Sequence, residues 1–292
     1  MDDTRLPELN RRTILGDLRV IVSDFINSKD LLVQLTLRDI RVRYKQAALG
    51  FAWALLLPVT IVLAGLAVRI AIAVASGREM NGHQLAGMAV KSVPWAFFVG
   101  CIGAGTSSLT GNITLVTKVY FPREVLPVAA CFAQSFDSLI GLCAVSVLLI
   151  PMGVTLAPTT AWIFLLLPLL WVYTLGTVIL LSCANLFFRD VKYLVQVFLS
   201  FGIFFTPVLV DAAMFGAKGA PILMLNPISP ILEGLRLSVV EHHNLLEPML
   251  APKGFVVWHP WYLAYSAVWA VGLLLIASVI FHRAERRFAL FV

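Results

Sequence analysis

The sequence predicts an all-α membrane protein with six transmembrane helices. Of its 292 residues, 60% are hydrophobic and only 13% are charged, and the mean hydropathy is +0.90. One soluble core of this length could not bury so much apolar surface. The apolar runs are continuous and do not alternate with polar residues, which favours helices over a membrane barrel.

Six stretches are predominantly apolar over about 20 or more residues, the length that crosses about 30 Å of hydrocarbon. We expect spans near residues 51–75, 95–117, 125–150, 161–186, 193–212 and 261–281. Of the 22 Lys and Arg residues, 16 fall in segments on the same side as the N-terminus, five fall on the other side, and Arg69 lies within a span. This asymmetry predicts that both termini are cytoplasmic. The first 30 residues have no short apolar core with a cleavage site, so we expect no cleaved signal peptide.

Residues 29–49 are predicted to form an amphipathic helix on the membrane surface. They follow a polar cytoplasmic extension, residues 1–28, and precede a transmembrane permease domain, residues 50–292. The run LLVQLTLRDIRVRYKQAALG, residues 31–50, is basic and ends at a Leu-Gly pair directly before the first span. Because the positive charge is concentrated beside membrane segments, we expect membrane lipid as its counterpart and no nucleic acid.

Residues 213–257, between the fifth and sixth predicted spans, are too apolar for a free linker. Their apolar pieces are short or interrupted by Pro221, Pro227 and Pro230. Two re-entrant half-helices fit both facts, since irregular backbone at membrane depth must pack against protein or line a wet cavity. An amphipathic helix lying flat on the outer face is the alternative.

We expect only two charged residues, Arg69 and Asp137, at membrane depth within the spans. Arg69 is close to the outer end of its span and can extend its charge to the interface. Asp137 lies near the middle of its span and is expected to face a wet cavity, a subunit interface or a partner such as Gln134. A role in packing and a role in lining a substrate path are equally compatible with the sequence.

Two further patterns leave alternatives open. The aromatic residues Tyr44, Phe51 and Trp53 fit an interfacial belt, and they also fit a surface on which the apolar faces of sugar rings stack. The second span is rich in small residues such as Gly100 and Gly103, which allow close helix packing. We expect this packing within the bundle, although a contact between subunits would use the same residues.

Several catalytic patterns are absent from the sequence. There is no G-x-x-x-x-G-K-[ST] phosphate loop, no H-E-x-x-H, no C-x-x-C and no G-x-S-x-G. We therefore expect a chain that is not an enzyme by itself and holds no cofactor or metal. A glycan-modifying enzyme would need converging acid, base or nucleophile side chains. An ion-coupled carrier is disfavoured because the spans contain so few ionisable groups.

Six ordered motifs together resemble one family. They are RDIRVRYKQAALGFAWALLLP (38–58), KVYFPREVLP (118–127), NLFFRDVKYLVQVFL (185–199), FFTPVL (204–209), LNPISPILEGLR (225–236) and ERRFALFV (285–292). After residue 25, nearly the whole chain resembles the permease subunit of type-2 ABC transporters that export O-antigen, capsular polysaccharide or teichoic acid. An exporter of drugs or lipids is the closest alternative.

The resemblance implies a permease for lipid-linked polysaccharide, most similar to those for O-antigen in lipopolysaccharide biosynthesis, in the bacterial cytoplasmic (inner) membrane. It implies a homodimer that works with two copies of an ATP-binding cassette subunit, on which ATP and Mg²⁺ are bound. The path would lie between the two permease copies, lined by the first and fifth spans, and would end beside residues 213–257.

Site residues carry over by position in the matching motifs. The substrate entry and its gate correspond to Arg41, Arg43, Tyr44, Lys45, Leu49, Gly50, Phe51 and Trp53. Here Gly50 permits a tight turn, and the cations can attract the diphosphate of the lipid carrier. Anchoring to anionic lipid explains Arg41 and Lys45 equally well. Asp137 is a possible channel-lining residue. The short coupling helix for the ATP-binding subunit corresponds to Lys118, Phe121, Pro122, Arg123 and Glu124.

Overall fold

The structure, a computed structural model, describes residues 23, 25–45, 50–76, 82–119, 121–251, 254–285 and 288. Most of the predicted extension 1–28 and the gate residue Leu49 therefore lie outside the described residues. The described chain is largely helical, which confirms an all-α membrane protein. Its only strands are the short pair β1 (Met249–Leu250) and β2 (Val256–Trp258), which pair antiparallel.

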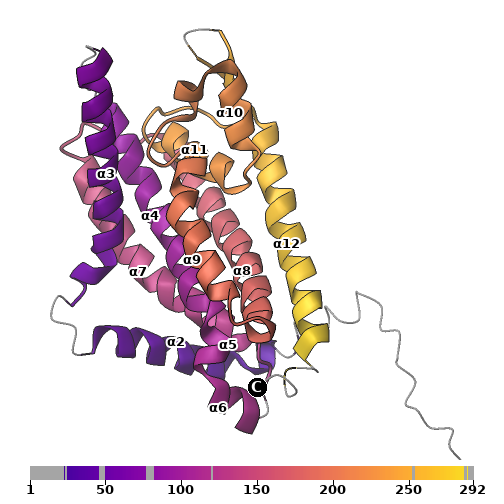
Figure 1. Cartoon of the computed structure of the whole chain (residues 1–292). Coiled ribbons are helices and arrows are strands. Elements are labelled where there is room, and N and C mark those ends of the chain that lie inside the picture. Colours follow the sequence, from indigo (N-terminus) through magenta and orange to yellow (C-terminus); the bar gives the residue numbers. More distant parts are fainter. Residues whose placement is uncertain are drawn as a thin grey trace, which may run out of the picture.

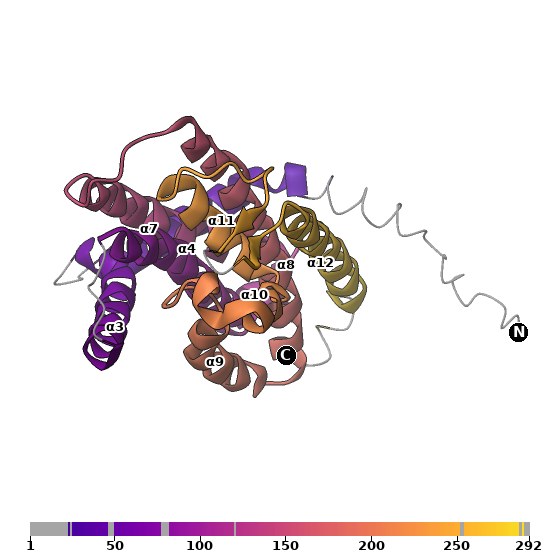
Figure 2. The same cartoon turned by 90° about the horizontal axis from the view of Figure 1, so that it is seen from above.

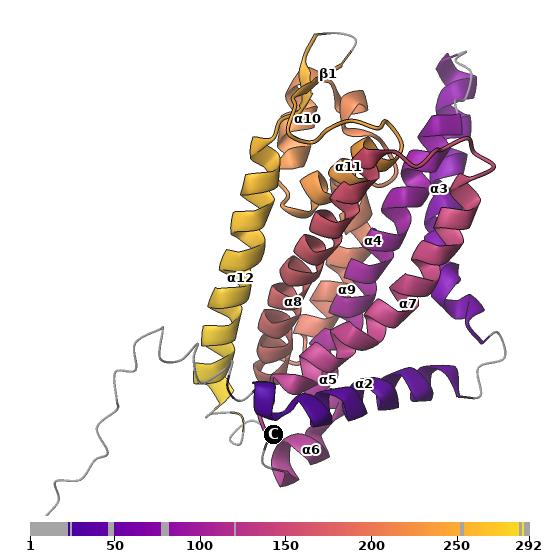
Figure 3. The same cartoon turned by 180° about the vertical axis from the view of Figure 1, so that it is seen from behind.

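The long helices run side by side along one axis (Figures 1 and 3). They are α3 (Ala52–Ser76), α4 (Gly82–Thr106), α7 (Val125–Leu149), α8 (Ile163–Phe187), α9 (Val191–Gly202) and α12 (Trp261–Glu285). The helix α2 (Lys29–Tyr44) lies across one end of this bundle and packs against α7. The short helices α5 (Ser108–Gly111) and α6 (Ile113–Lys118) are at the same end, and α6 projects beyond α2.

Four segments are long and apolar enough to cross a membrane: Gly82–Thr106, Val125–Leu149, Pro158–Phe187 and Trp261–Glu285. The third begins with the 3₁₀ turn η1 (Pro158–Trp162) and continues into α8. The first predicted span corresponds to α3, a helix of 25 residues. The fifth corresponds to α9 and the 3₁₀ turn η2 (Ile203–Phe205), and it ends before the predicted residue 212. Six spans therefore remain a prediction.

The predicted bounds of the second span, 95–117, both lie too far toward the C-terminus. The helix α4 already starts at Gly82 and ends at Thr106, after which α5 and α6 are separate short helices. Lys91 therefore lies inside a candidate span, and the expectation that only Arg69 and Asp137 are charged within spans is wrong. A hydropathy scan penalises Lys91, whereas the fold buries it completely beside carboxylates.

The bundle is built around α4. This helix packs against α3, α7, α8, α9 and α11 (Ile228–Val239) and is mostly buried, whereas α7 and α12 expose much of their apolar surface. Seen from above, α3 stands at the periphery of the bundle (Figure 2). A Cβ added at Gly176 of α8 would lie 2.8 Å from the backbone nitrogen of Leu274, so glycine is needed where α8 and α12 approach.

The predicted re-entrant region contains two short helices at the end of the bundle opposite α2 (Figure 1). They are α10 (Gly216–Met224), which follows the 3₁₀ turn η3 (Ala212–Phe215), and α11. Every residue of α11 is buried, and this helix packs against α4, α8 and α12. Pro227 and Pro230 occupy its N-terminal cap and first turn, where proline is tolerated. A dip into the membrane remains a prediction for both helices.

Candidate functional site

The predicted substrate entry comprises the C-terminal end of α2 and the start of α3. Two cations of the last turn of α2, Arg41 and Arg43, lie where the helix dipole favours positive charge. The helix stops at Tyr44, and Lys45 is extended, with its backbone N–H donating to the Arg41 carbonyl oxygen at 2.8 Å. Shortly before α3, Gly50 has a φ of 50°, a conformation that residues with a side chain rarely adopt.

Asp137 of α7 is the partner of this helix end. Arg43 forms an ion pair with its carboxylate and donates a second hydrogen bond, at 3.0 Å, to Oε1 of Gln134. Tyr44 Oη donates to the other carboxylate oxygen at 2.5 Å. Gln134 itself packs on Gly100 of α4, where a Cβ would lie 2.5 Å from the Gln134 side chain. The helix α2 is thus fixed to the bundle through a carboxylate within a candidate span.

Aromatic rings surround the same point. The ring of Tyr44 lies 4.8 Å from that of Phe51 at the start of α3, and both contact Phe136. Burial, the hydrogen bond to Asp137 and the charge of that carboxylate all raise the pKa of Tyr44. The phenol therefore stays protonated and keeps donating to Asp137.

The other predicted entry residues are more open to the surroundings. Arg41 and Lys45 are exposed at the end of α2, and Phe51 and Trp53 are exposed at the start of α3. The structure therefore divides the predicted set. Arg43 and Tyr44 hold an internal contact, while the others present charge and aromatic surface outward.

A groove with a volume of about 640 Å³ lies between α3, α4 and α9. Trp95 and Gly103 of α4 line its wall, with Leu57 and Ile61 of α3 on one side. The helix α9 contributes polar residues to the opposite side, including Gln196 and Ser200, and none of its residues is buried. Apolar side chains on α3 and α9 are exposed beside this groove, so two helices with open apolar faces flank a partly polar hollow.

In the predicted coupling segment, 118–124, the first residue is the only helical one among those that the structure describes, 118, 119 and 121–124. The helix is α6, which ends at Lys118. Ile113, Lys118 and Val119 are exposed there, and Val119 retains 49% of its accessible surface. Phe121 and Pro122 are half-buried. The end of the bundle therefore presents a small surface with two apolar and two polar side chains, which we call the α6 surface and define as Ile113, Thr117, Lys118 and Val119.

Arg123 has partners within the chain. Its guanidinium pairs with Glu285 at the end of α12 at 3.6 Å, donates to the Val116 carbonyl oxygen, and lies 6.0 Å from the centre of the Phe288 ring. The Glu285 side chain also accepts from the Arg123 backbone N–H at 3.1 Å. Glu124 is buried. Arg123 joins the start of α7 to the end of α12 and Glu124 is enclosed, so both are less available to an outside partner than the α6 surface is.

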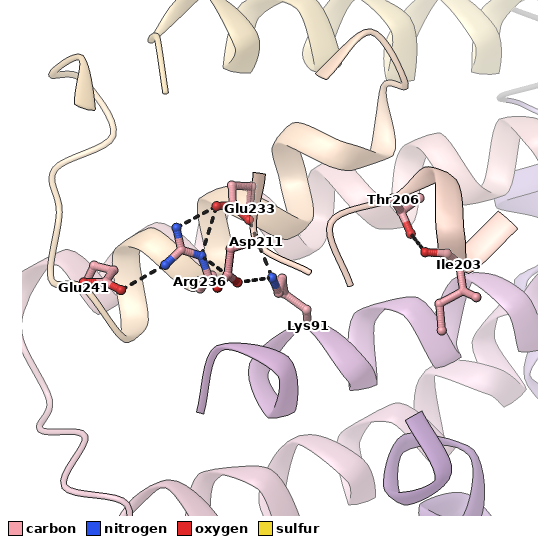
Figure 4. A network of polar contacts seen from close by, with 7 residues as sticks. All are labelled: Lys91, Ile203, Thr206, Asp211, Glu233, Arg236 and Glu241. Carbon is pink, nitrogen blue, oxygen red and sulfur yellow. Dashed lines mark hydrogen bonds and ion pairs between the residues drawn. The ribbon is translucent and has the colours of Figure 1, made fainter. Parts of the chain in front are cut away.

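A second charged cluster lies near the other end of the bundle (Figure 4). Lys91 Nζ of α4 lies 2.9 Å from Asp211 Oδ1 and 3.6 Å from Glu233 Oε2 of α11. Arg236 of α11 lies 2.6 Å from Glu233 Oε1 and 2.9 Å from Glu241 Oε1. The side chains of Lys91 and Glu233 are completely buried. This cluster ties α4, the segment after α9, and α11 together.

The chain is similar in sequence to several known proteins. It is 27% identical over 276 residues to the "O-antigen export system permease protein RfbA" of Myxococcus xanthus, covering 92% of this chain and 98% of that protein. It is also 27% and 24% identical to two proteins of the same name from Klebsiella pneumoniae, each over 70% of this chain and 77% of the relative. No protein-family model matches the chain.

The resemblance predicted from the motifs is confirmed. The chain is similar to type-2 ABC permeases for O-antigen export along nearly its whole length, and with four apolar helices it is a multi-pass membrane protein. Among the residues that the structure describes, no three His, Cys, Asp or Glu side chains come together as metal ligands.

Sequence reasoning found Arg43, Tyr44 and Asp137 separately but did not pair them. It missed the cluster of Lys91, Asp211, Glu233 and Arg236, because it assigned these residues to outer loops or to the end of a span. A usable signal was present, since three carboxylates and two cations occur in otherwise apolar segments at 91, 211, 233, 236 and 241. Charges in such segments are expected to be paired.

Proposed function

We infer that the chain is the permease subunit of an ATP-driven exporter that moves a lipid-linked, O-antigen-like polysaccharide across the cytoplasmic membrane. The observation that carries this inference is the similarity to an O-antigen export permease over 98% of that protein's length. The groove between α3, α4 and α9 and the helix α2 across one end of the bundle are compatible with it. No covalent chemistry takes place on this chain.

We further propose that two permease copies form the path. The open apolar faces of α3 and α9 flank the groove, and a second copy placed against them would turn two open grooves into one enclosed path. Polar side chains such as Gln196 and Ser200 would face the glycan, while the exposed Tyr193 offers a ring on which sugars can stack. The substrate would enter beside Arg41, Lys45 and the turn at Gly50 and leave beside α10 and α11.

The α6 surface is our proposed contact with the ATP-binding subunit, which would carry ATP and Mg²⁺ and be present in two copies. Exposed apolar side chains at a projecting helix can fill a cleft of a partner, with Lys118 at the rim. In this arrangement α2, α6 and both termini are cytoplasmic. Arg123 then supports the contact by fixing the start of α7 to the end of α12.

A complementation experiment tests the proposed export. Deleting the gene should remove the polysaccharide from the cell surface and leave lipid-linked glycan inside, and the intact gene should restore the surface glycan. Val119→Asp should fail to restore it, because a charge would be placed in the apolar contact. Leu156→Asp is the matched control, since Leu156 is exposed and follows the far end of α7, a helix of 25 residues that begins near the α6 surface. Unchanged surface glycan after the deletion would contradict the proposed function.

A further inference from the structure

Asp137 forms an ion pair with Arg43, one of the cations that the family resemblance assigns to the substrate entry. The proposed substrate is itself negatively charged at its diphosphate. Arg43 lies in the last turn of α2, and its side chain remains 31% exposed, whereas that of Asp137 is 8% exposed. The ion pair therefore has one accessible member and one enclosed member. An anion arriving from the open side meets the arginine and not the carboxylate.

The arginine has the chemistry for an exchange of partners. Both of its described hydrogen bonds, to Asp137 and to Gln134, use Nη1. A guanidinium has five N–H donors and binds phosphate through two of them at once. A diphosphate carries more negative charge than one carboxylate, and the exposed cations Arg41 and Lys45 lie beside the same helix end.

We propose that Asp137 is an internal competitor for the substrate's diphosphate: it holds Arg43 when the site is empty and gives it up when a lipid diphosphate binds. This inference rests on the proposed function and adds a positioning residue to it. Asp137 does not contact the substrate. It lowers the affinity for the lipid diphosphate because its ion pair with Arg43 competes with substrate binding.

The exchange would also loosen the contact between α2 and the start of α3. The rings of Tyr44 and Phe51 lie against each other, and Tyr44 donates to the same carboxylate that pairs with Arg43. When Arg43 turns to the diphosphate, only the phenol still links α2 to Asp137. The strained backbone at Gly50 then provides the point at which the end of α2 can move relative to α3.

The test measures lipid binding to the purified permease with its ATP-binding partner, using a short-chain polyprenyl diphosphate without glycan as the probe. Asp137→Asn should raise the affinity about tenfold, because it removes a charge-assisted competitor from Arg43. The matched control is Asp39→Asn, which also removes one negative charge. Asp39 lies on α2 and pairs with Arg38 at 2.8 Å. The affinity of this control should stay within about twofold of the wild-type value, as expected for an exposed pair.

A double mutant identifies the route of the effect. In an Arg43→Gln background, Asp137→Asn should no longer raise the affinity, because the two residues act through one contact. Gln134→Leu gives a second approach if Asp137→Asn assembles poorly, since it weakens the hold on Arg43 without leaving a charge unpaired. It should raise the affinity about threefold. A role of Asp137 in folding alone would lower the affinity in every variant.

Three results would overturn the inference. One is an affinity of Asp137→Asn equal to or below that of the wild type. Another is an equal gain in Asp39→Asn, which would reflect net charge. The third is displacement of the probe by phosphatidylglycerol vesicles as effectively as by inorganic diphosphate, since the occupant would then be ordinary anionic lipid. If the wild-type complex binds no lipid diphosphate at all, the proposed function fails as well, and the two failures are therefore distinguishable.

Discussion

Replacing Lys91 by methionine should strongly destabilise the permease, because it leaves buried carboxylates without their cation. At an effective dielectric constant of about 20, unit charges attract by about 6 kcal/mol at the 2.9 Å between Lys91 Nζ and Asp211, and by about 5 kcal/mol at the 3.6 Å to Glu233. Desolvation offsets much of this attraction. Removing one partner of a buried pair costs about 3–5 kcal/mol, and we expect a loss in that range for Lys91→Met.

The assay is thermal unfolding of the detergent-solubilised protein, followed by size-exclusion chromatography with fluorescence detection. The expected loss corresponds to a decrease in melting temperature of about 5–8 °C. Lys218→Met is the matched control, since Lys218 is exposed on α10 at the same end of the bundle, and its melting temperature should be unchanged. Adding Asp211→Asn to Lys91→Met should recover part of the loss. Equal melting temperatures for Lys91→Met and Lys218→Met, or strictly additive losses in the double mutant, would refute the reasoning.

Three further predictions follow from local structure: two concern glycines, and the third concerns the contact of Arg123 with α12. Gly176→Ala should lower the melting temperature by several degrees, because its Cβ would meet the backbone of α12, while Gly103→Ala faces open space and should not; equal values would contradict this packing. Gly50→Val should reduce surface glycan severalfold with assembly intact, since a φ of 50° costs a side-chain-bearing residue about 1–2 kcal/mol; unaltered export would count against a hinge there. Arg123→Ala should speed hydrogen exchange near Glu285, and unchanged exchange would show that the contact does not hold α12.

Composition and periodicity were sufficient to predict the class of protein and the place of most long helices. Length and continuous hydrophobicity are local properties, so the apolar runs that became α7, α8 and α12 are visible in the sequence alone. The start of α4 was predicted wrongly for a physical reason. Its first half contains Lys91, which a local scan counts as polar, and the carboxylates that make its burial tolerable lie at 211 and 233.

The same limit applies to the site. Arg43 and Asp137 were each conspicuous, one by the basic helix in which it lies and the other by its depth in a span. Their pairing depends on how α2 crosses α7, a tertiary contact between residues 94 positions apart. A partner such as Gln134 was one of three alternatives considered for Asp137, and Gln134 instead shares Arg43 with it. The helix nearest the predicted coupling segment, α6, also lies earlier in the sequence than predicted, because Asn112 and Val119 mark its ends and Arg123 contacts α12.

Co-purification from the native membrane tests the central claim most directly. The tagged chain, extracted in mild detergent, should carry an ATP-binding subunit with a phosphate-loop motif at equal stoichiometry. Val119→Asp in the α6 surface should lose this subunit, and Leu156→Asp should retain it. A chain that purifies alone and intact from membranes in which it is functional would contradict the assignment to an ABC exporter.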